Sequence, residues 1–345
     1  MSATSGASEA RARDRARPMI YRPAAGMGVN TLLVNAGRRV ELLTMLRTAC
    51  QGRVIAVDID AVAPTLYHAD VAERVPAVAD PAFVERLLEL CAAHTVGLVV
   101  PTTDRELAVL SRRSGEFLAI GAHLAIAASD GVLAAQDKLA CASMLLAAGV
   151  AAVPTQRWLA AETPPFGFPV VVKPRSGSAG EGVRVIPASD QWTAPPPGQD
   201  WLVQPLISGS EVTLDVLSAD GGRVLCLGAR RRLKVRGGEV ERAQTVPAEP
   251  FLELAANVAA ALALTGPFNF QVLIEAGTPL VGEVNPRLGG GLPLSQHAGA
   301  GLLESLCDWA SRGEWQTGPP SLARPGVYMT RYDSSTFLES DELAW

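Results

Sequence analysis

A lysine next to a glycine-rich loop is the first group of residues in this sequence that could do chemistry. Only three of the 30 basic residues are lysines: Lys138, Lys173 and Lys234. Lys173 ends the apolar run Val170-Val-Val, and the segment Ser176-Gly-Ser-Ala-Gly-Glu-Gly182 follows soon after it. Such a loop lets backbone N–H groups approach phosphate oxygens closely, and a lysine adds a compact positive charge at the same place. The pattern indicates phosphate binding, with a flexible hairpin that ends in a chance lysine as the alternative.

A predicted β-hairpin at residues 268–285 carries polar side chains on one face. If its turn is centred on Gly277, the pairing across its two strands is fixed. The polar residues then pair as Gln271 with Glu283 and Asn269 with Asn285. Residues two apart on a strand share a face, so the four side chains lie together. Carboxylate and amide oxygens are ligands that Mg²⁺ prefers, so the pattern predicts a magnesium site, with a solvated sheet face as the alternative.

The elements that must position these motifs begin with an alternation of short apolar runs and amphipathic stretches. The apolar runs predict buried strands at Thr31–Asn35, Arg53–Val57 and Val96–Val100. The amphipathic stretches predict helices at Val40–Cys50, Pro81–His94 and Asp104–Arg112. Strands that alternate with helices favour an open parallel sheet, whose ligand crevice lies at the carboxyl ends of the strands. Only one of the three glycines of a dinucleotide fingerprint follows the first strand, so we do not expect NAD binding.

The chain changes character near residue 126. We expect a helix at Asp130–Ala148, closed by Gly149, and then a region rich in strands. Strands are predicted at Val170–Lys173, Gly182–Ile186, Trp201–Gln204, Val212–Leu217, Arg223–Leu227, Phe268–Ile274 and Leu280–Val284, with one helix at Glu249–Leu264. Runs of strands crossed by a helix are typical of an antiparallel α+β domain. A last strand, at Val327–Tyr332, is expected to pack back on the sheet.

Composition narrows the class of protein. The chain has 345 residues, is 48% hydrophobic and carries a net charge of −5, which predicts about two folded domains and argues against a nucleic-acid binder. No apolar run reaches the roughly 20 residues of a membrane helix. The five cysteines stand singly, which favours buried free thiols and a cytoplasmic location. Residues 1–29 lack apolar periodicity and are expected to form a disordered tail, with an organelle-targeting leader as the alternative.

Five motifs occur in a characteristic order. They are Asp137-Lys138 on a helix, the strand Val170–Pro174, the loop Ser176–Gly182, Gln271, and Glu283-Val-Asn-Pro-Arg287. In this order they resemble the ATP-grasp superfamily, and more narrowly the single-copy proteins related to one half of the carbamoyl phosphate synthetase large subunit. The resemblance covers about residues 30–312. It implies an ATP-grasp fold with an open parallel-sheet (pre-ATP-grasp) domain at 30–125, an ATP-grasp domain at 126–312 with ATP between its central and C-terminal subdomains, and a C-terminal extension at 313–345.

The resemblance also implies roles for individual residues. Lys138 and Lys173 would hold ATP phosphates, under a loop that includes Ser176, Gly177, Ser178, Gly180 and Gly182. The main chain at Gln204, Leu206 and Ile207 would contact adenine, and Glu211 would bind the ribose; Gln204 replaces the usual acid, and Pro205 has no N–H to donate. Gln271, Glu283 and Asn285 match the magnesium positions, and Arg287 matches the arginine that steadies an acyl phosphate. The catalytic residues would be Lys173, Asn285 and Arg287.

The implied function is that of a ligase with ATP and Mg²⁺, or Mn²⁺ in its place, as cofactors. It would activate a small carboxylate as an acyl phosphate and join it to an amine. A bicarbonate-activating carboxylase or carbamoyl-phosphate-type enzyme is one alternative, and a non-catalytic ATP-binding regulatory protein is another. A homodimer is expected from the resemblance alone.

Two groups of residues are candidates for substrate binding. The sequence does not show which side chains of the basic segment face the site: Arg230, Arg231, Arg232, Lys234 or Arg236. Cations there would suit a carboxylate or phosphate. Glu41, Asp104 and Arg105, at the crevice of the parallel sheet, would suit an amine or an amino acid.

Overall fold

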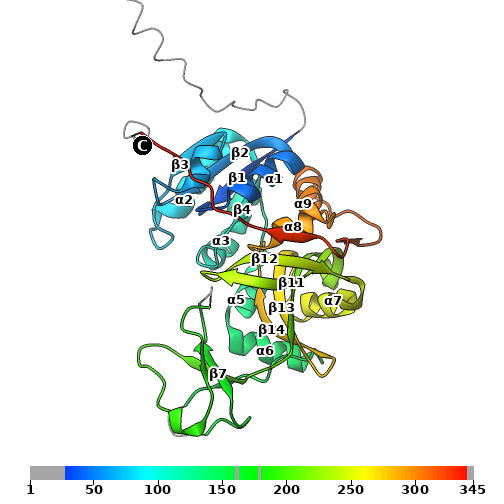
Figure 1. Ribbon diagram of the computed structural model, residues 1–345. Coiled ribbons are helices and arrows are strands. Elements are labelled where there is room, and N and C mark those ends of the chain that lie inside the picture. The colour runs from blue at the N-terminus through cyan, green and yellow to red at the C-terminus, as the bar shows by residue number, and fades with distance from the viewer. Residues whose placement is uncertain (1–27, 160–162, 178–179, 340–345) are drawn as a thin grey trace, which may run out of the picture.

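The structure is a computed structural model that describes residues 28–159, 163–177 and 180–339. Within these ranges the strands form a parallel five-stranded sheet, a large and mostly antiparallel sheet, and an antiparallel four-stranded sheet. Figure 1 shows the parallel sheet at one end of the molecule, the small sheet around β7 at the other end, and the large sheet between them. The architecture is the predicted ATP-grasp arrangement, in which an α/β domain precedes the antiparallel region. Residues 1–27, most of the predicted tail, lie outside the described ranges.

The parallel sheet has the strand order β3-β2-β1-β4-β5. Its elements are β1 (Val29–Val34), α1 (Val40–Cys50), β2 (Gln51–Asp58), the 3₁₀ turn η1 (Pro64–His68), β3 (Val71–Arg74), α2 (Ala82–His94), β4 (Val96–Pro101), α3 (Leu107–Arg112), α4 (Ser114–Ala119) and β5 (His123–Leu124). Leu32 belongs to the core cluster of helix α2, whereas Leu33 belongs to that of α1. Both faces of the sheet are therefore covered, which is why its strands are continuous apolar runs. Strand β1 begins at Val29, one residue before the expected domain boundary.

The large sheet has the order β14-β13-β10-β11-β12-β16, with β15 beside β11. Its strands are β10 (Ser210–Ala219), β11 (Arg223–Arg236), β12 (Glu239–Val246), β13 (Gly266–Glu275), β14 (Thr278–Asn285), β15 (Ser321–Leu322) and β16 (Tyr328–Thr330); the turns η3 (Asp220–Gly222) and η4 (Glu249–Phe251) and the helices α7 (Leu252–Ala261), α8 (Leu292–His297) and α9 (Leu302–Arg312) accompany them. Strand β12 was not predicted, because its buried Val240 and Ala243 are three residues apart and show no period of two. The expected C-terminal strand is the shorter β16, and it pairs with β12.

The small sheet has the order β6-β9-β7-β8 and its own apolar core. Its elements are β6 (Gln156–Arg157), β7 (Val170–Pro174), β8 (Arg184–Ile186), the turn η2 (Ser189–Gln191) and β9 (Trp201–Pro205). Trp158 and Trp201 contact each other edge to face in that core, with ring centroids 6.1 Å apart. The separate core indicates that the small sheet is a folding unit distinct from the large one.

The helix expected at Asp130–Ala148 is broken. Helix α5 (Ser129–Gln136) ends before Asp137, and α6 (Lys138–Ala147) begins after it. Asp137 has an extended backbone, and its carboxylate accepts the N–H groups of Leu139 and Ala140, as an N-cap does. The single-helix prediction was wrong because it followed apolar content and overlooked this cap. The break places Lys138 at the first position of α6.

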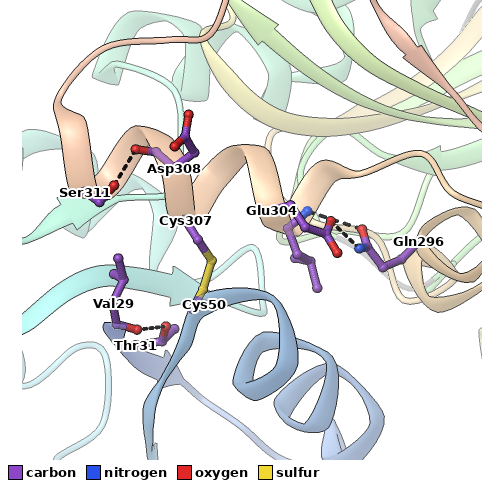
Figure 2. The surroundings of a disulfide bond; sticks show 9 residues. Val29, Thr31, Cys50, Gln296, Glu304, Cys307, Asp308 and Ser311 are labelled. Atoms are coloured by element: carbon purple, nitrogen blue, oxygen red, sulfur yellow. Dashed lines mark hydrogen bonds between the residues drawn. A yellow bond between two sulfur atoms is a disulfide. The ribbon is translucent and has the colours of Figure 1, made fainter. Parts of the chain in front are cut away.

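The expectation that all five cysteines are free thiols was also wrong. Cys50, at the end of α1, forms a disulfide with Cys307 of α9, 257 residues later in the chain (Figure 2). Cys91, Cys141 and Cys226 are free and buried. The cysteines therefore no longer support a cytoplasmic location. As for membranes, we find among the described helices none whose length and hydropathy would let it cross a bilayer.

Candidate active site

Two lysines, the glycine-rich loop and a glutamate of the β13–β14 hairpin line one cavity between the small and large sheets. Lys138 comes from the start of α6, Lys173 from the end of β7, and Glu283 from β14. The cavity lining also includes Pro174, Ser176, Gly177, Gly180, Glu181 and Val183. Two lysines and a run of backbone groups therefore surround the same space as a carboxylate. This arrangement suits a polyphosphate with a bound cation.

Asp137 and Arg175 hold Lys138 in this cavity. The guanidinium of Arg175 donates to both carboxylate oxygens of Asp137, at 2.9 and 2.6 Å, and this pairing holds the pKa of that carboxyl below its usual range. The backbone N–H of Lys138 lies 3.3 Å from the carbonyl oxygen of Arg175. The Lys138 ammonium donates to the carbonyl of Gly177 at 2.6 Å. Helix α6 and the glycine-rich loop are therefore joined directly beside the cavity.

Lys173 is almost fully buried, with 7% of its surface exposed. Burial lowers the pKa of its ammonium, and the charge of nearby Glu283 opposes that shift. Gly182 has φ +74°, and a Cβ there would lie 2.9 Å from the ring of Pro174, so no other residue fits the end of the loop. Ser178, a predicted loop residue, lies outside the described residues.

The polar face of the β13–β14 hairpin has the predicted register. Gln271 pairs with Glu283 and Asn269 pairs with Asn285. The face continues onto the next strands, because Thr213 of β10 pairs with both Gln271 and Arg230, and Asp215 pairs with Asn269. Four adjacent strands therefore present polar residues to one side of the sheet. Gln271, Glu283 and Asn285 offer neighbouring oxygen donors there, and this donor set fits Mg²⁺.

The register also shows which members of the basic segment face the site. Arg230 lies on the polar face and pairs with Asp215 at 2.8 Å, in surroundings where both side chains are nearly fully buried. Arg232 lies on the same face, next to Glu211, with which it forms an ion pair. Arg231 is exposed, as expected for the opposite face of a strand. Lys234 and Arg236 bind acidic side chains nearer the tip of the β11–β12 hairpin: Glu241 and Asp333.

Three consecutive glycines, at positions 289–291, pack directly on this polar face. A Cβ on Gly291 would lie 2.3 Å from the guanidinium of Arg230, and one on Gly289 would lie 3.0 Å from Asp215. Ser295 completes the group by donating to Asp215 at 2.6 Å. Sequence reasoning missed this buried network. The glycine run was its one visible signal.

The expected adenine segment forms part of the small sheet. The amide of Gln204 donates to the hydroxyl of Thr155 at 2.7 Å, so this side chain is already engaged. The backbone N–H of Leu206 donates to the carbonyl of Pro169 at 3.1 Å. Since Pro205 has no N–H, Ile207 is left as the donor of this segment that could serve an adenine ring.

Arg287 faces the crevice of the parallel sheet. Its guanidinium donates to both carboxylate oxygens of Asp104, at 2.9 and 2.7 Å, in a pair whose side chains are 14% and 18% exposed. Glu106 fixes the loop that carries Asp104 by accepting the backbone N–H groups of Thr102 and Thr103, at 3.0 and 2.8 Å. Burial raises the pKa of the Glu106 carboxyl. Arg105, another predicted substrate residue, is exposed.

Comparisons with known proteins identify related families and one curated relative. Residues 31–125 match the family described as PylC-like, N-terminal domain, and residues 198–329 match the family described as ATP-grasp in the biosynthetic pathway with Ter operon. The formate-dependent phosphoribosylglycinamide formyltransferase of Synechococcus sp. (strain RCC307) is 26% identical over 284 residues, which are 74% of this chain and 68% of that protein.

Solved structures share the fold at low identity. The L-amino acid ligase of Bacillus licheniformis superposes with a TM-score of 0.64 at 15% identity, over 83% of this chain and 75% of that one. The pyruvate carboxylase of Rhizobium etli gives a TM-score of 0.66 at 16% identity, over 82% of this chain but 28% of that one. This chain therefore spans little more than a quarter of the carboxylase. The family match over residues 198–329 therefore identifies an ATP-grasp region in this chain, and the ordered motifs and the shared fold agree with the ATP-grasp superfamily.

Proposed function

We propose that the protein is an ATP-dependent ligase that joins a small carboxylate to an amine. The observation that carries the proposal is the meeting of Lys138, Lys173 and Glu283 in one cavity. Strand β14 then leads from Glu283 past Asn285 to Arg287, at the crevice of the parallel sheet. The strand that contributes Glu283 to this cavity therefore leads directly to Arg287 at the crevice, which supports a reaction between a bound phosphate and a substrate carboxylate.

Each residue has a definite task in this reaction. A substrate carboxylate oxygen attacks the γ-phosphorus of ATP, ADP leaves, and the amine then displaces phosphate from the acyl carbon and loses a proton. Lys138 and Lys173 offset the charge of the phosphates, and the glycine-rich loop excludes water. Arg287 holds the acyl phosphate through charge-assisted hydrogen bonds. Gln271, Glu283 and Asn285 would hold Mg²⁺ or Mn²⁺, which when bound offsets the negative charge on the phosphates.

Nucleotide binding uses one unengaged donor and requires one local exchange. The N–H of Ile207 serves the adenine ring. Glu211 must release Arg232 before it can accept the ribose hydroxyls, since the two side chains pair in this structure. The L-amino acid ligase that shares the fold supports amide-bond formation, whereas the pyruvate carboxylase supports activation of bicarbonate, so the test must separate the two.

The test is release of ADP and phosphate from ATP and Mg²⁺, with pooled carboxylates and amines supplied separately and together, and with bicarbonate in a separate arm. We expect release that needs both pools. Glu283→Gln should lower it about 10²- to 10³-fold, as expected for loss of a preorganised charge. Glu275→Gln is the matched control, because Glu275 is exposed at the turn of the same hairpin. Release with bicarbonate alone, or no release with any combination, would refute the ligase.

A further inference from the structure

A second group of arginines lies beside Arg287 in the crevice. Arg39 follows strand β1, and Arg331 follows strand β16 at the opposite end of the chain. Arg331 donates to the carbonyl of Gly290 at 2.5 Å and to that of Val240 at 3.2 Å, so its guanidinium has a fixed position. In Figure 1 the C-terminal segment that carries Arg331 runs from the large sheet back along the N-terminal domain.

One carboxylate joins these two arginines. Glu239 places Oε1 3.1 Å from Arg39 and Oε2 3.8 Å from Arg331, so each of its oxygens faces a different guanidinium. The arginine side chains are 25% and 22% exposed, whereas that of Glu239 is 55% exposed. The carboxylate of Glu239 therefore lies nearer to solvent than the two guanidinium groups that it contacts.

Glu239 lies at the start of a strand, next to a turn made of two glycines. It is the first residue of β12, directly after the exposed hairpin turn Gly237-Gly238, where both glycines have positive φ. Two consecutive glycines leave the turn with wide backbone freedom. The guanidinium of Arg39 packs against the backbone at Gly290, because a Cβ on Gly290 would lie 2.8 Å from it.

Several positive charges surround Arg39 and favour binding of an anion there. Burial lowers the pKa of Arg39, Glu239 opposes that shift, and the nearby Arg287, Arg331 and Arg38 lower it further. An anion placed between Arg39 and Arg331 would therefore relieve repulsion among several cations. Glu239 supplies that anion between the two arginines in this structure, and Arg331 also pairs with Glu41 at 3.4 Å.

We propose that Arg39 and Arg331 form a subsite for a second carboxylate of the substrate, and that Glu239 occupies this subsite until the substrate displaces it. The inference rests on the proposed function, in which Arg287 serves the reacting carboxylate. It names the substrate class as a dicarboxylate, one of whose acid groups is activated while the other is held between Arg39 and Arg331.

The test uses pairs of ligands that differ by one charge: succinate with succinamate, and glutarate with glutaramate. Their affinities for the full-length protein are measured by calorimetry without turnover, in the presence of Mg²⁺ and ADP. We expect a diacid to bind at least ~10-fold more tightly than its monoamide, as fits a charge-assisted pair. Arg331→Gln should abolish the preference, and Glu239→Gln should strengthen diacid binding several-fold, because it removes the internal competitor.

Arg242→Gln is the control, since Arg242 is a 59% exposed arginine on the same strand as Glu239. If Arg331→Gln fails to fold, Glu239→Gln decides by itself. Equal affinity for diacid and monoamide, or no binding of either, would overturn the proposal, as would a Glu239→Gln variant without a gain in diacid affinity. Failure of ATP turnover with the diacid preference intact would refute only the ligase. Turnover without that preference would refute only the second subsite.

Discussion

Arg287 and Asp104 form a bidentate ion pair across the crevice, between residues 183 positions apart in the chain. The carboxylate of Asp104 therefore occupies the place where the proposed mechanism puts a substrate carboxylate or an acyl phosphate. Substrate binding must break this pair, and its strength opposes binding.

Asp104→Asn should accordingly tighten binding of the carboxylate substrate. The amide keeps the size of the side chain but loses the charge-assisted pairing, so the KM for the carboxylate should fall by up to ~10-fold while thermal stability drops slightly. Steady-state kinetics with the amine held saturating measure the effect. A rise in the KM for the amine would instead show that Asp104 binds the amine.

The buried charge of Lys173 should lower the free energy of unfolding of the nucleotide-free protein at neutral pH. Burial lowers its pKa, so the unfolded chain binds the proton more readily than the folded one. The penalty of the buried charge is complete below the folded pKa and fades as the pH rises toward about 10.4, the unfolded value. Lys173→Met should therefore raise the melting temperature at pH 7, with a smaller gain near pH 10, and abolish turnover. A lower melting temperature at pH 7 would show that Lys173 stabilises the fold.

The hairpin that carries the proposed metal ligands shows how far sequence reasoning reaches. The predicted pairing of Gln271 with Glu283 is confirmed, yet the turn is Ala276-Gly277, half a residue from the assumed centre. That turn pairs Val272 with Val281, and a bulge at Gly282 then restores the predicted register. The polar pattern identified the correct pairs because one face had to collect them. The only sign of the bulge in the sequence is the glycine at position 282.

Contacts between distant segments could not be predicted at all. The pairing of Arg39 with Glu239 and the disulfide between Cys50 and Cys307 depend on how the N-terminal domain docks on the rest of the chain. Hydrophobic periodicity indicates whether a segment is a helix or a strand and which of its faces is buried. It does not indicate how one domain packs against another. The site was therefore predictable where one hairpin or one loop builds it, and not where two domains meet.

Gly291 should tolerate no side chain. A Cβ there would lie 2.3 Å from the buried guanidinium of Arg230, so Gly291→Ala must displace Arg230 from Asp215. We expect a loss of roughly 1–3 kcal/mol in the free energy of unfolding, measured by urea denaturation. Gly115→Ala is the control, because Gly115 lies in helix α4 with nothing within 4 Å of the added Cβ, and it should be neutral or stabilising. Equal effects of both variants would show that the loop can yield.

The disulfide joins helix α1 of the N-terminal domain to helix α9, which follows the large sheet (Figure 2). Protein denatured without reductant should therefore expose three reactive thiols, those of Cys91, Cys141 and Cys226, and all five after reduction. Because the bridge closes a loop of more than 250 residues, the double variant Cys50→Ser, Cys307→Ser should lose about 2–4 kcal/mol of stability. Cys226→Ser serves as a control for loss of a buried thiol. Five thiols before reduction would show that the two helices are held together by packing alone.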